Sequence, residues 1–337
     1  MTDTTDQSSF IMHRFRFRAM GSNVEIAVRC EPADIQRVEQ LAKDWFEAAE
    51  MRFSRFRPHS ELSWLNRLEG GRFLISDAML EVLLLAEAFH LQTEGTFDPF
   101  ILNALRHAGY DRTFDEVKRR TDPPASSAPV RPDTKRQLLV DPVMKSVRLP
   151  LNMEIDLGGI VKSWTVKRLE SYFQDKLAIT RGFINAGGDL TVWSKPRDED
   201  EPWLIGIENA WKPEADIGTL AISNGSAATS SKLGRTWPAA DGIMRHHLID
   251  PSTMRPSQSD AVQCTVSGWD IIGCEIWAKT ICILGVTEGL SLLARNSRNY
   301  EALVFTDKHE VVYYGSKLSL GKQWNGLTID HYHYADA

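Results

Sequence analysis

The chain has 337 residues, of which 42% are hydrophobic and 25% are charged, a composition typical of a folded globular protein rather than a disordered one. Its formal net charge of −6 argues against a general binder of nucleic acids or anionic membranes, because such proteins carry a clustered basic surface. No run of about 18 apolar residues occurs, so we expect no transmembrane helix.

Cysteine usage and the first residues both bear on the cellular compartment. The opening sequence MTDTTDQSSF is polar and acidic, whereas a signal peptide has a basic start and an apolar stretch. The cysteines form no CxxC pair, which favours buried free thiols in a reducing environment. They are Cys30, Cys264, Cys274 and Cys282. We therefore expect a cytoplasmic protein without a lipid-attachment cysteine.

The N-terminal part predicts two strands and then helices. After a disordered tail over residues 1–12, hydrophobic and polar residues alternate on both sides of Met20-Gly21-Ser22, so we expect two strands joined by a turn there. Pro32 favours the first turn of a helix, and apolar residues then recur at helical spacing as far as Ala49.

Strands and helices alternate irregularly through the rest of the chain. We expect a helix that is capped by Ser76 and ends near Gly95, a proline-rich surface insertion over 121–135, and a hairpin over 138–149. Two further helices are expected, one after Gly159 and one over about 272–284. Strands are expected over 183–185, 190–193, 203–207, 302–306 and 311–314. The absence of a regular β-α-β rhythm favours the α+β class over doubly wound α/β.

Glycine-marked segments are the first candidates for a binding site. Glycine permits a positive φ and a close approach of the backbone to a ligand. In the stretch from Asp156 to Lys162, two glycines precede a helix and the lysine lies one turn in, which suits an anion such as phosphate. A simple turn is the alternative interpretation. Neither GxGxxG nor the P-loop pattern is present, which disfavours a dinucleotide fold and an NTPase.

Charged residues near the C-terminus are the second set of candidates. Glu275 and Lys279 are four apart, the favoured order for an ion pair within a helix, so they predict either a solvated face or part of a site. His246 and His247 with Asp250 contain zinc-ligating residue types, but no third ligand follows at metal spacing. No GxSxG nucleophile motif occurs.

In order along the chain, these segments resemble the ApbE-like family, the FAD:protein FMN transferases, from about residue 15 to residue 312. The resemblance is carried by Met20-Gly21-Ser22, Ser60-Glu61-Leu62-Ser63, Gly95-Thr96-Phe97-Asp98-Pro99, the segment from Asp156 to Lys162, Asn185-Ala186-Gly187-Gly188-Asp189, Gly206-Ile207-Glu208, Ala228-Thr229-Ser230, Arg235, His247-Leu248-Ile249-Asp250-Pro251 and the helix with Glu275. It implies one α+β domain over residues 13–334, with two lobes and an FAD cleft between them.

The resemblance also implies a reaction and its residues. Enzymes of the family cleave FAD at the pyrophosphate and transfer FMN to a Ser or Thr of an acceptor flavoprotein, releasing AMP, with the help of Mg²⁺. The implied FAD-site residues are Met20, Phe56, Thr96, Phe97, Asp98, Asp156, Lys162, Leu248 and Ile249. The implied catalytic residues are His247, Asp156 and Lys162, and the implied metal positions are Gly159, Glu275 and Lys279.

Two departures from the family pattern affect the expected chemistry. The family has Asp and then Thr as oxygen donors where this chain has Glu275 and Lys279. An ammonium group cannot ligate a metal and repels it, so Lys279 is expected to take the place of the cation, paired with Glu275. Phe56 replaces a Tyr and keeps a stacking face. Two alternatives to a transferase follow: an FAD-binding carrier without transfer activity, and an FAD pyrophosphatase in which water replaces the acceptor hydroxyl.

Overall fold

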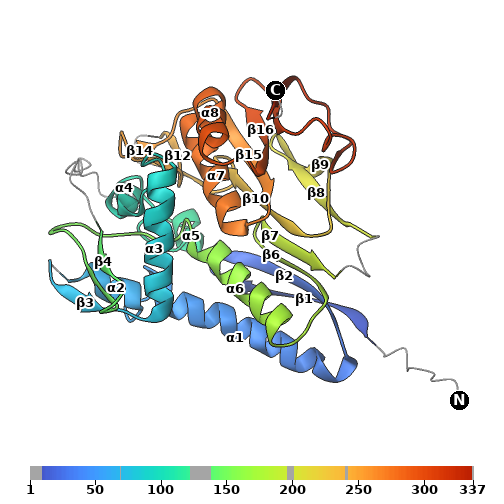
Figure 1. Cartoon of the computed structure of the whole chain (residues 1–337). Helices are drawn as coiled ribbons and strands as arrows, with labels where there is room; N and C mark the ends of the chain where they lie inside the picture. The colour runs from blue at the N-terminus through green and yellow to red at the C-terminus, as the bar shows by residue number, and fades with distance from the viewer. Residues whose placement is uncertain (1–9, 69, 122–137, 196–200, 240–241, 336–337) are drawn as a thin grey trace, which may run out of the picture.

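The computed structural model describes residues 10–68, 70–121, 138–195, 201–239 and 242–335, and a nine-stranded sheet forms its centre (Figure 1). In spatial order the strands are β1 (Ile11–Ala19), β2 (Ser22–Cys30), β6 (Arg181–Ala186), β7 (Asp189–Ser194), β10 (Gly225–Ser231), β15 (Ala261–Gly268), β16 (Tyr300–Thr306), β17 (Val311–Gly315) and β19 (His331–Tyr334). All neighbours are antiparallel except β17 and β19.

Two groups of helices cover one face of this sheet. The helices α1 (Ile35–Phe53), α3 (Asp77–Gln92) and α6 (Val161–Asp175) share a hydrophobic core with β1, β2 and β6. The helices α7 (Ile271–Leu284) and α8 (Val286–Asn296) share a second core with β10, β15, β16 and β17. Helix α6 also contacts α7, so the two groups adjoin.

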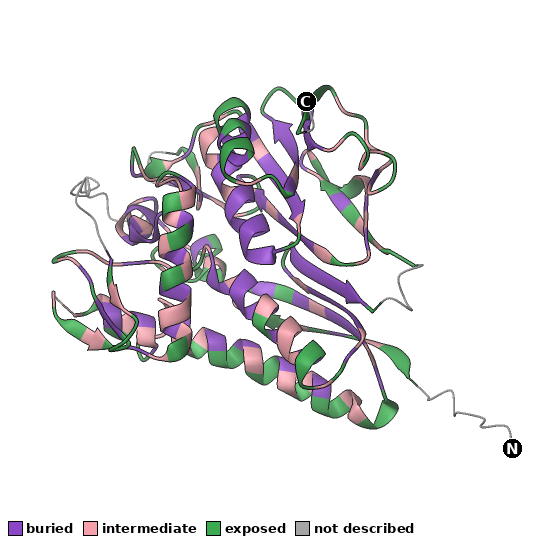
Figure 2. Ribbon diagram, in the orientation of Figure 1, coloured by how far each residue is buried: buried purple, intermediate pink, exposed green. Residues whose placement is uncertain are grey.

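The opposite face of the sheet is covered by a small sheet of three strands, in the order β18 (Trp324–Asn325), β9 (Lys212–Ile222) and β8 (Trp203–Asn209). Side chains of β16 alternate between the two faces: Val304 belongs to the core with α7, and its neighbours Leu303 and Phe305 belong to the core with the small sheet. A strand with both faces covered is hydrophobic throughout, and Figure 2 shows the central strands as buried.

Short elements form a fourth hydrophobic cluster beside the helices. They are α4 (Leu102–His107), which follows a 3₁₀ turn at Pro99–Ile101, α5 (Phe114–Lys118), and the two-stranded pairs β11 (Thr236–Pro238) with β12 (Met244–His246) and β13 (Ile249–Asp250) with β14 (Arg255–Pro256). Elsewhere, α2 (Glu61–Asn66) follows α1, and β3 (Arg72–Leu74), β5 (Ser146–Arg148) and β4 (Leu139–Asp141) form a further small sheet.

Most of the expected elements are present with shifted ends. The turn between β1 and β2 has positive φ at Met20 and Gly21, and Ser76 caps α3 by accepting a hydrogen bond from the Met79 amide at 3.2 Å. Helix α3 ends at Gln92, and the expected hairpin over 138–149 forms between β4 and β5.

Differences from expectation concern the N-terminus and several elements that were not expected, among them the strands β9, β10 and β15. Strand β1 begins at Ile11, inside the segment expected as a tail, because Ile11 pairs with Cys30 of β2. Residues 1–9 lie outside the described residues, as does the expected insertion over 121–135 except for Thr121. Helix α8 was not expected. None of the described helices combines the length and apolar character needed to cross a membrane.

Candidate functional site

A cleft of about 410 Å³ lies where three of the hydrophobic clusters meet. Phe97 and Val161 come from the core of α1, α3 and α6, Leu248 from the core of α7, and Ile249 from the cluster of short elements. Every site residue that the family resemblance implies lines this cleft: Met20, Phe56, Thr96, Phe97, Asp98, Asp156, Gly159, Lys162, His247, Leu248, Ile249, Glu275 and Lys279. Residues that are far apart in the sequence are thus brought to one place, while their individual roles stay predictions.

The glycine-rich segment before α6 places its polar residues by local bonds. The Asp156 amide donates to the Pro99 carbonyl at 2.8 Å, and Oδ1 of Asp156 accepts from the Gly158 amide at 3.0 Å. Leu157 is fully buried and fixes the segment between these polar ends. The first turn of α6 then carries Lys162 into the cleft.

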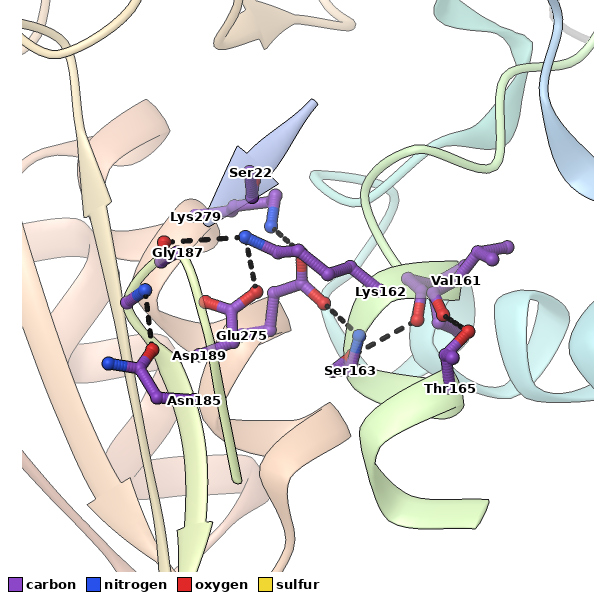
Figure 3. A network of polar contacts seen from close by, with 12 residues as sticks. Ser22, Val161, Lys162, Ser163, Thr165, Asn185, Gly187, Asp189, Glu275 and Lys279 are labelled. Carbon is purple, nitrogen blue, oxygen red and sulfur yellow. Dashed lines mark hydrogen bonds and ion pairs between the residues drawn. The ribbon is translucent and has the colours of Figure 1, made fainter. Parts of the chain in front are cut away.

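Lys162 forms an ion pair with a buried carboxylate that was not among the expected site residues (Figure 3). Its Nζ lies 2.9 Å from Oδ2 of Asp189, at the start of β7, and 3.5 Å from the Gly187 carbonyl. Gly187 has a φ of +62°, and a Cβ there would lie 2.8 Å from Ser22, so the turn requires glycine. Burial, reinforced by the Glu275 carboxylate, raises the pKa of Asp189 to about 6.

Glu275 and Lys279 form an ion pair inside the protein rather than on a solvated face. Nζ of Lys279 lies 2.5 Å from Oε1 of Glu275, and the Ser163 amide donates to Oε2 at 3.3 Å (Figure 3). Burial alone would raise the pKa of Glu275, but the Lys279 and Lys162 ammonium groups outweigh it and hold this pKa below its usual value. Glu275 is therefore an anion held by donors of its own chain.

The imidazole of His247 is kept neutral. Burial lowers its pKa well below the ordinary value, and the nearby positive charges of Arg235 and Lys279 lower it further. Its Nδ1 is buried with no hydrogen-bond partner among the described residues. A neutral imidazole beside cationic side chains can accept a proton from a hydroxyl group. By contrast, Nε2 of His246 lies 3.0 Å from the Ser257 carbonyl, and its Nδ1 accepts from an amide.

Arg55 belongs to the cleft and was missed at the sequence level. Its Nε lies 2.9 Å from Oδ2 of Asp156, with side-chain exposures of 7% and 11%. The guanidinium group lies 4.2 Å from the ring centroid of Phe56 and 4.7 Å from that of Tyr110. No local spacing signals this pair, because its two members come from distant segments of the chain.

Several aromatic rings line the cleft. The ring centroids of Phe56 and Tyr110 are 5.9 Å apart, and Tyr110 also contacts Phe114 at 6.4 Å. Flat π faces suit a planar ring ligand, whereas Lys162, Lys279 and Arg235 suit an anion. The cleft thus combines the two kinds of surface that a nucleotide needs.

The three expected metal positions come together but do not fit a magnesium ion. Mg²⁺ prefers six oxygen ligands in octahedral geometry, whereas here an ammonium group contacts the carboxylate of Glu275. Within the described residues, no three His, Cys, Asp or Glu side chains are grouped so that they could hold a metal ion.

Comparisons with known proteins agree with the resemblance seen in the sequence. The FAD:protein FMN transferase of Vibrio cholerae is 24% identical over 86% of this chain and 86% of its own. That of Klebsiella pneumoniae is 29% identical over 52% of this chain and 54% of its own, so this alignment spans about half of the relative's length.

Solved structures share the fold. The ApbE protein of Thermotoga maritima has a TM-score of 0.77 at 20% identity, covering 89% of this chain and 96% of its own. The flavin transferase ApbE of Vibrio cholerae has a TM-score of 0.73 at 20% identity, with 88% and 94% covered. The expected α+β fold is thereby confirmed. The model of the ApbE family matches residues 20–304, most of the chain, and the protein therefore belongs to the ApbE family.

Proposed function

We propose that the protein is an FAD:protein FMN transferase, which joins the FMN half of FAD to a Ser or Thr hydroxyl of an acceptor flavoprotein and releases AMP. The observation that carries this proposal is the single cleft that brings together His247, Lys162 and a set of aromatic rings. Membership of the ApbE family and the function of the relatives, which are FAD:protein FMN transferases, support it.

Binding of FAD would use both kinds of surface in the cleft. The ring systems of the dinucleotide suit the aromatic faces of Phe56, Tyr110 and Phe97. Its diphosphate carries negative charge that suits the ammonium group of Lys162 and the guanidinium group of Arg235. The positive charge on these side chains neutralises the diphosphate, so that an alcohol oxygen can approach the phosphorus atom.

The transfer step needs one proton acceptor and no covalent enzyme intermediate. His247 takes the proton from the acceptor hydroxyl while the oxygen attacks the phosphorus atom of the FMN half. The new phosphoester bond forms, the anhydride P–O bond breaks, and AMP leaves. Asp156 supports the cleft through its ion pair with Arg55. We assign no step to Mg²⁺, because the residues at the expected metal positions do not fit it.

Mass spectrometry tests the proposal directly. Incubation with FAD and a panel of candidate acceptor flavoproteins should add the mass of one FMN group to a Ser or Thr of at least one acceptor. His247→Ala should slow this transfer by about a hundredfold or more. Release of AMP and free FMN without an acceptor would favour the pyrophosphatase. FAD binding without AMP release, with every acceptor, would favour the carrier.

A further inference from the structure

An ammonium group fills the place where the family resemblance puts a metal ion. The alkyl chain of Lys279 passes over the Gly159 backbone, because a Cβ built on Gly159 would lie 3.6 Å from Cε of Lys279. The Nζ atom then contacts Oε1 of Glu275 at 2.5 Å, and the Ser163 amide engages Oε2 at 3.3 Å. Both oxygens of the only acidic side chain among the three expected metal positions are thus occupied by donors of this chain.

The ion pair of Lys162 with Asp189 lies beside that of Lys279 with Glu275 (Figure 3). In both pairs the carboxylate is more deeply buried than the lysine. The side chains of Glu275 and Asp189 are 2% and 3% exposed, whereas those of Lys279 and Lys162 are each 16% exposed. The four formal charges cancel. Because the carboxylates are the more deeply buried members, the network presents its positive ends to the cleft.

A divalent ion would have to enter this network against two ammonium groups. It would need to displace Lys279 from Glu275 and then sit close to the displaced charge. A diphosphate has the opposite preference, because its oxygens accept hydrogen bonds from ammonium groups. The network is therefore suited to bind the anion without an intervening metal.

We propose that Lys279 is a built-in cation that binds the diphosphate of FAD in place of a divalent ion, so that FAD binding and FMN transfer proceed without Mg²⁺. This inference rests on the proposed function. The bonds made and broken are those of the transfer step above: the acceptor oxygen bonds to phosphorus, the anhydride bond breaks to release AMP, and the proton goes to His247. Lys279 contributes charge only and enters no bond.

Calorimetric titration with FAD, in EDTA and then in Mg²⁺, tests the inference without relying on activity. The wild-type protein should bind with dissociation constants that agree within about twofold in the two buffers. In EDTA, Lys279→Thr should weaken binding by at least about tenfold, whereas Lys279→Arg, which keeps the charge, should retain most of it. Lys167→Met is the matched control, since it removes an ion pair with Asp270 outside the cleft and should leave binding unchanged.

A double variant tests whether Lys279 occupies the place of an ion. Glu275→Asp combined with Lys279→Thr replaces the ammonium group with oxygen donors, and Mg²⁺ should then raise its melting temperature and tighten FAD binding by about tenfold or more. A folded double variant whose melting temperature and FAD binding do not change with Mg²⁺ would overturn the inference. So would a wild-type protein whose FAD binding tightens about tenfold with Mg²⁺, although the proposed function would stand. Failure to bind FAD in either buffer would overturn both.

Discussion

The imidazole of His247, which we propose as the proton acceptor, is kept neutral by its surroundings, and this has a consequence for the expected pH dependence of transfer. Its pKa lies well below the ordinary value of a histidine because the imidazole is desolvated in the cleft and lies near the positive charges of Arg235 and Lys279. Protonation would remove the proton acceptor, but at pH values near 6.5 the imidazole is still neutral.

We therefore expect kcat/KM for FMN transfer to stay constant from pH 8 down to about 6.5 and to fall only below it. Asp189, whose pKa is about 6, loses its charge in the same lower range. The measurement is a pH profile of transfer with a validated acceptor, accompanied by the FAD dissociation constant at each pH to separate binding from chemistry. An acidic limb with its midpoint at 6.5 or higher would contradict this assignment.

At the scale of single residues, the sequence could predict only part of the site. Local motifs such as Asp156 to Lys162 mark the segments that line the cleft, because backbone turns and helix starts depend on neighbouring residues. Ion pairs between distant segments have no such local signature. Arg55 with Asp156 and Lys162 with Asp189 are both of this kind, and both became visible only in the folded chain.

At the scale of the elements, α7 depends on close packing with α8. Gly289 of α8 is buried, and a Cβ on it would lie 2.8 Å from Cα of Ile281 in α7. This contact is with backbone, which cannot rotate away as a side chain tip can. Since α7 carries Glu275 and Lys279, the close approach of the two helices also supports the cleft.

We expect Gly289→Ala to lower the free energy of unfolding by about 1–2 kcal/mol, measured by urea denaturation. Alanine gains about 1 kcal/mol of helix propensity over glycine, but overpacking at 2.8 Å from a backbone atom should cost near the upper end of about 1–3 kcal/mol, so the clash prevails by about 1–2 kcal/mol. Glu288→Ala, at the exposed neighbouring position, is the control and should change stability by less than about 0.5 kcal/mol. A variant as stable as the wild-type protein would show that α8 shifts freely.

Element prediction succeeded where one periodic pattern dominates and failed where several compete. The alternation before and after Met20 and the apolar repeat of α1 were sufficient to predict strands and a helix. Helix α8 was missed because it follows α7 after the single residue Gly285, with no polar linker to separate the two. The pairing order of the sheet was not predictable, because register depends on contacts between distant strands.

At the scale of the whole molecule, the cleft touches three of the four hydrophobic clusters, so a ligand bound there contacts parts of the fold that separate on unfolding. FAD at a hundred times its dissociation constant should add about 2.7 kcal/mol to the free energy of unfolding. Differential scanning calorimetry should show this as a rise of several degrees in melting temperature.

Riboflavin supplies the control for this experiment. It has the flavin ring but no diphosphate, so it cannot engage Lys162 or Lys279 and should raise the melting temperature much less at equal concentration. An equal effect of the two compounds would mean that the ring alone provides the binding energy. Lys162 and Lys279 would then contribute nothing to the binding of FAD.

The dispersal of the cleft residues along the chain also determines when the cleft can form during synthesis. The site begins with Met20 in the first hairpin and ends with Lys279 and Ile283 in α7, so the chain must be synthesised at least as far as α7 before the cleft is complete. Strand β2 likewise cannot pair with its neighbour β6 until β6 has been synthesised, which happens much later. A chain synthesised only as far as β15 therefore lacks part of the cleft, and we expect it to bind FAD only after α7 has been made.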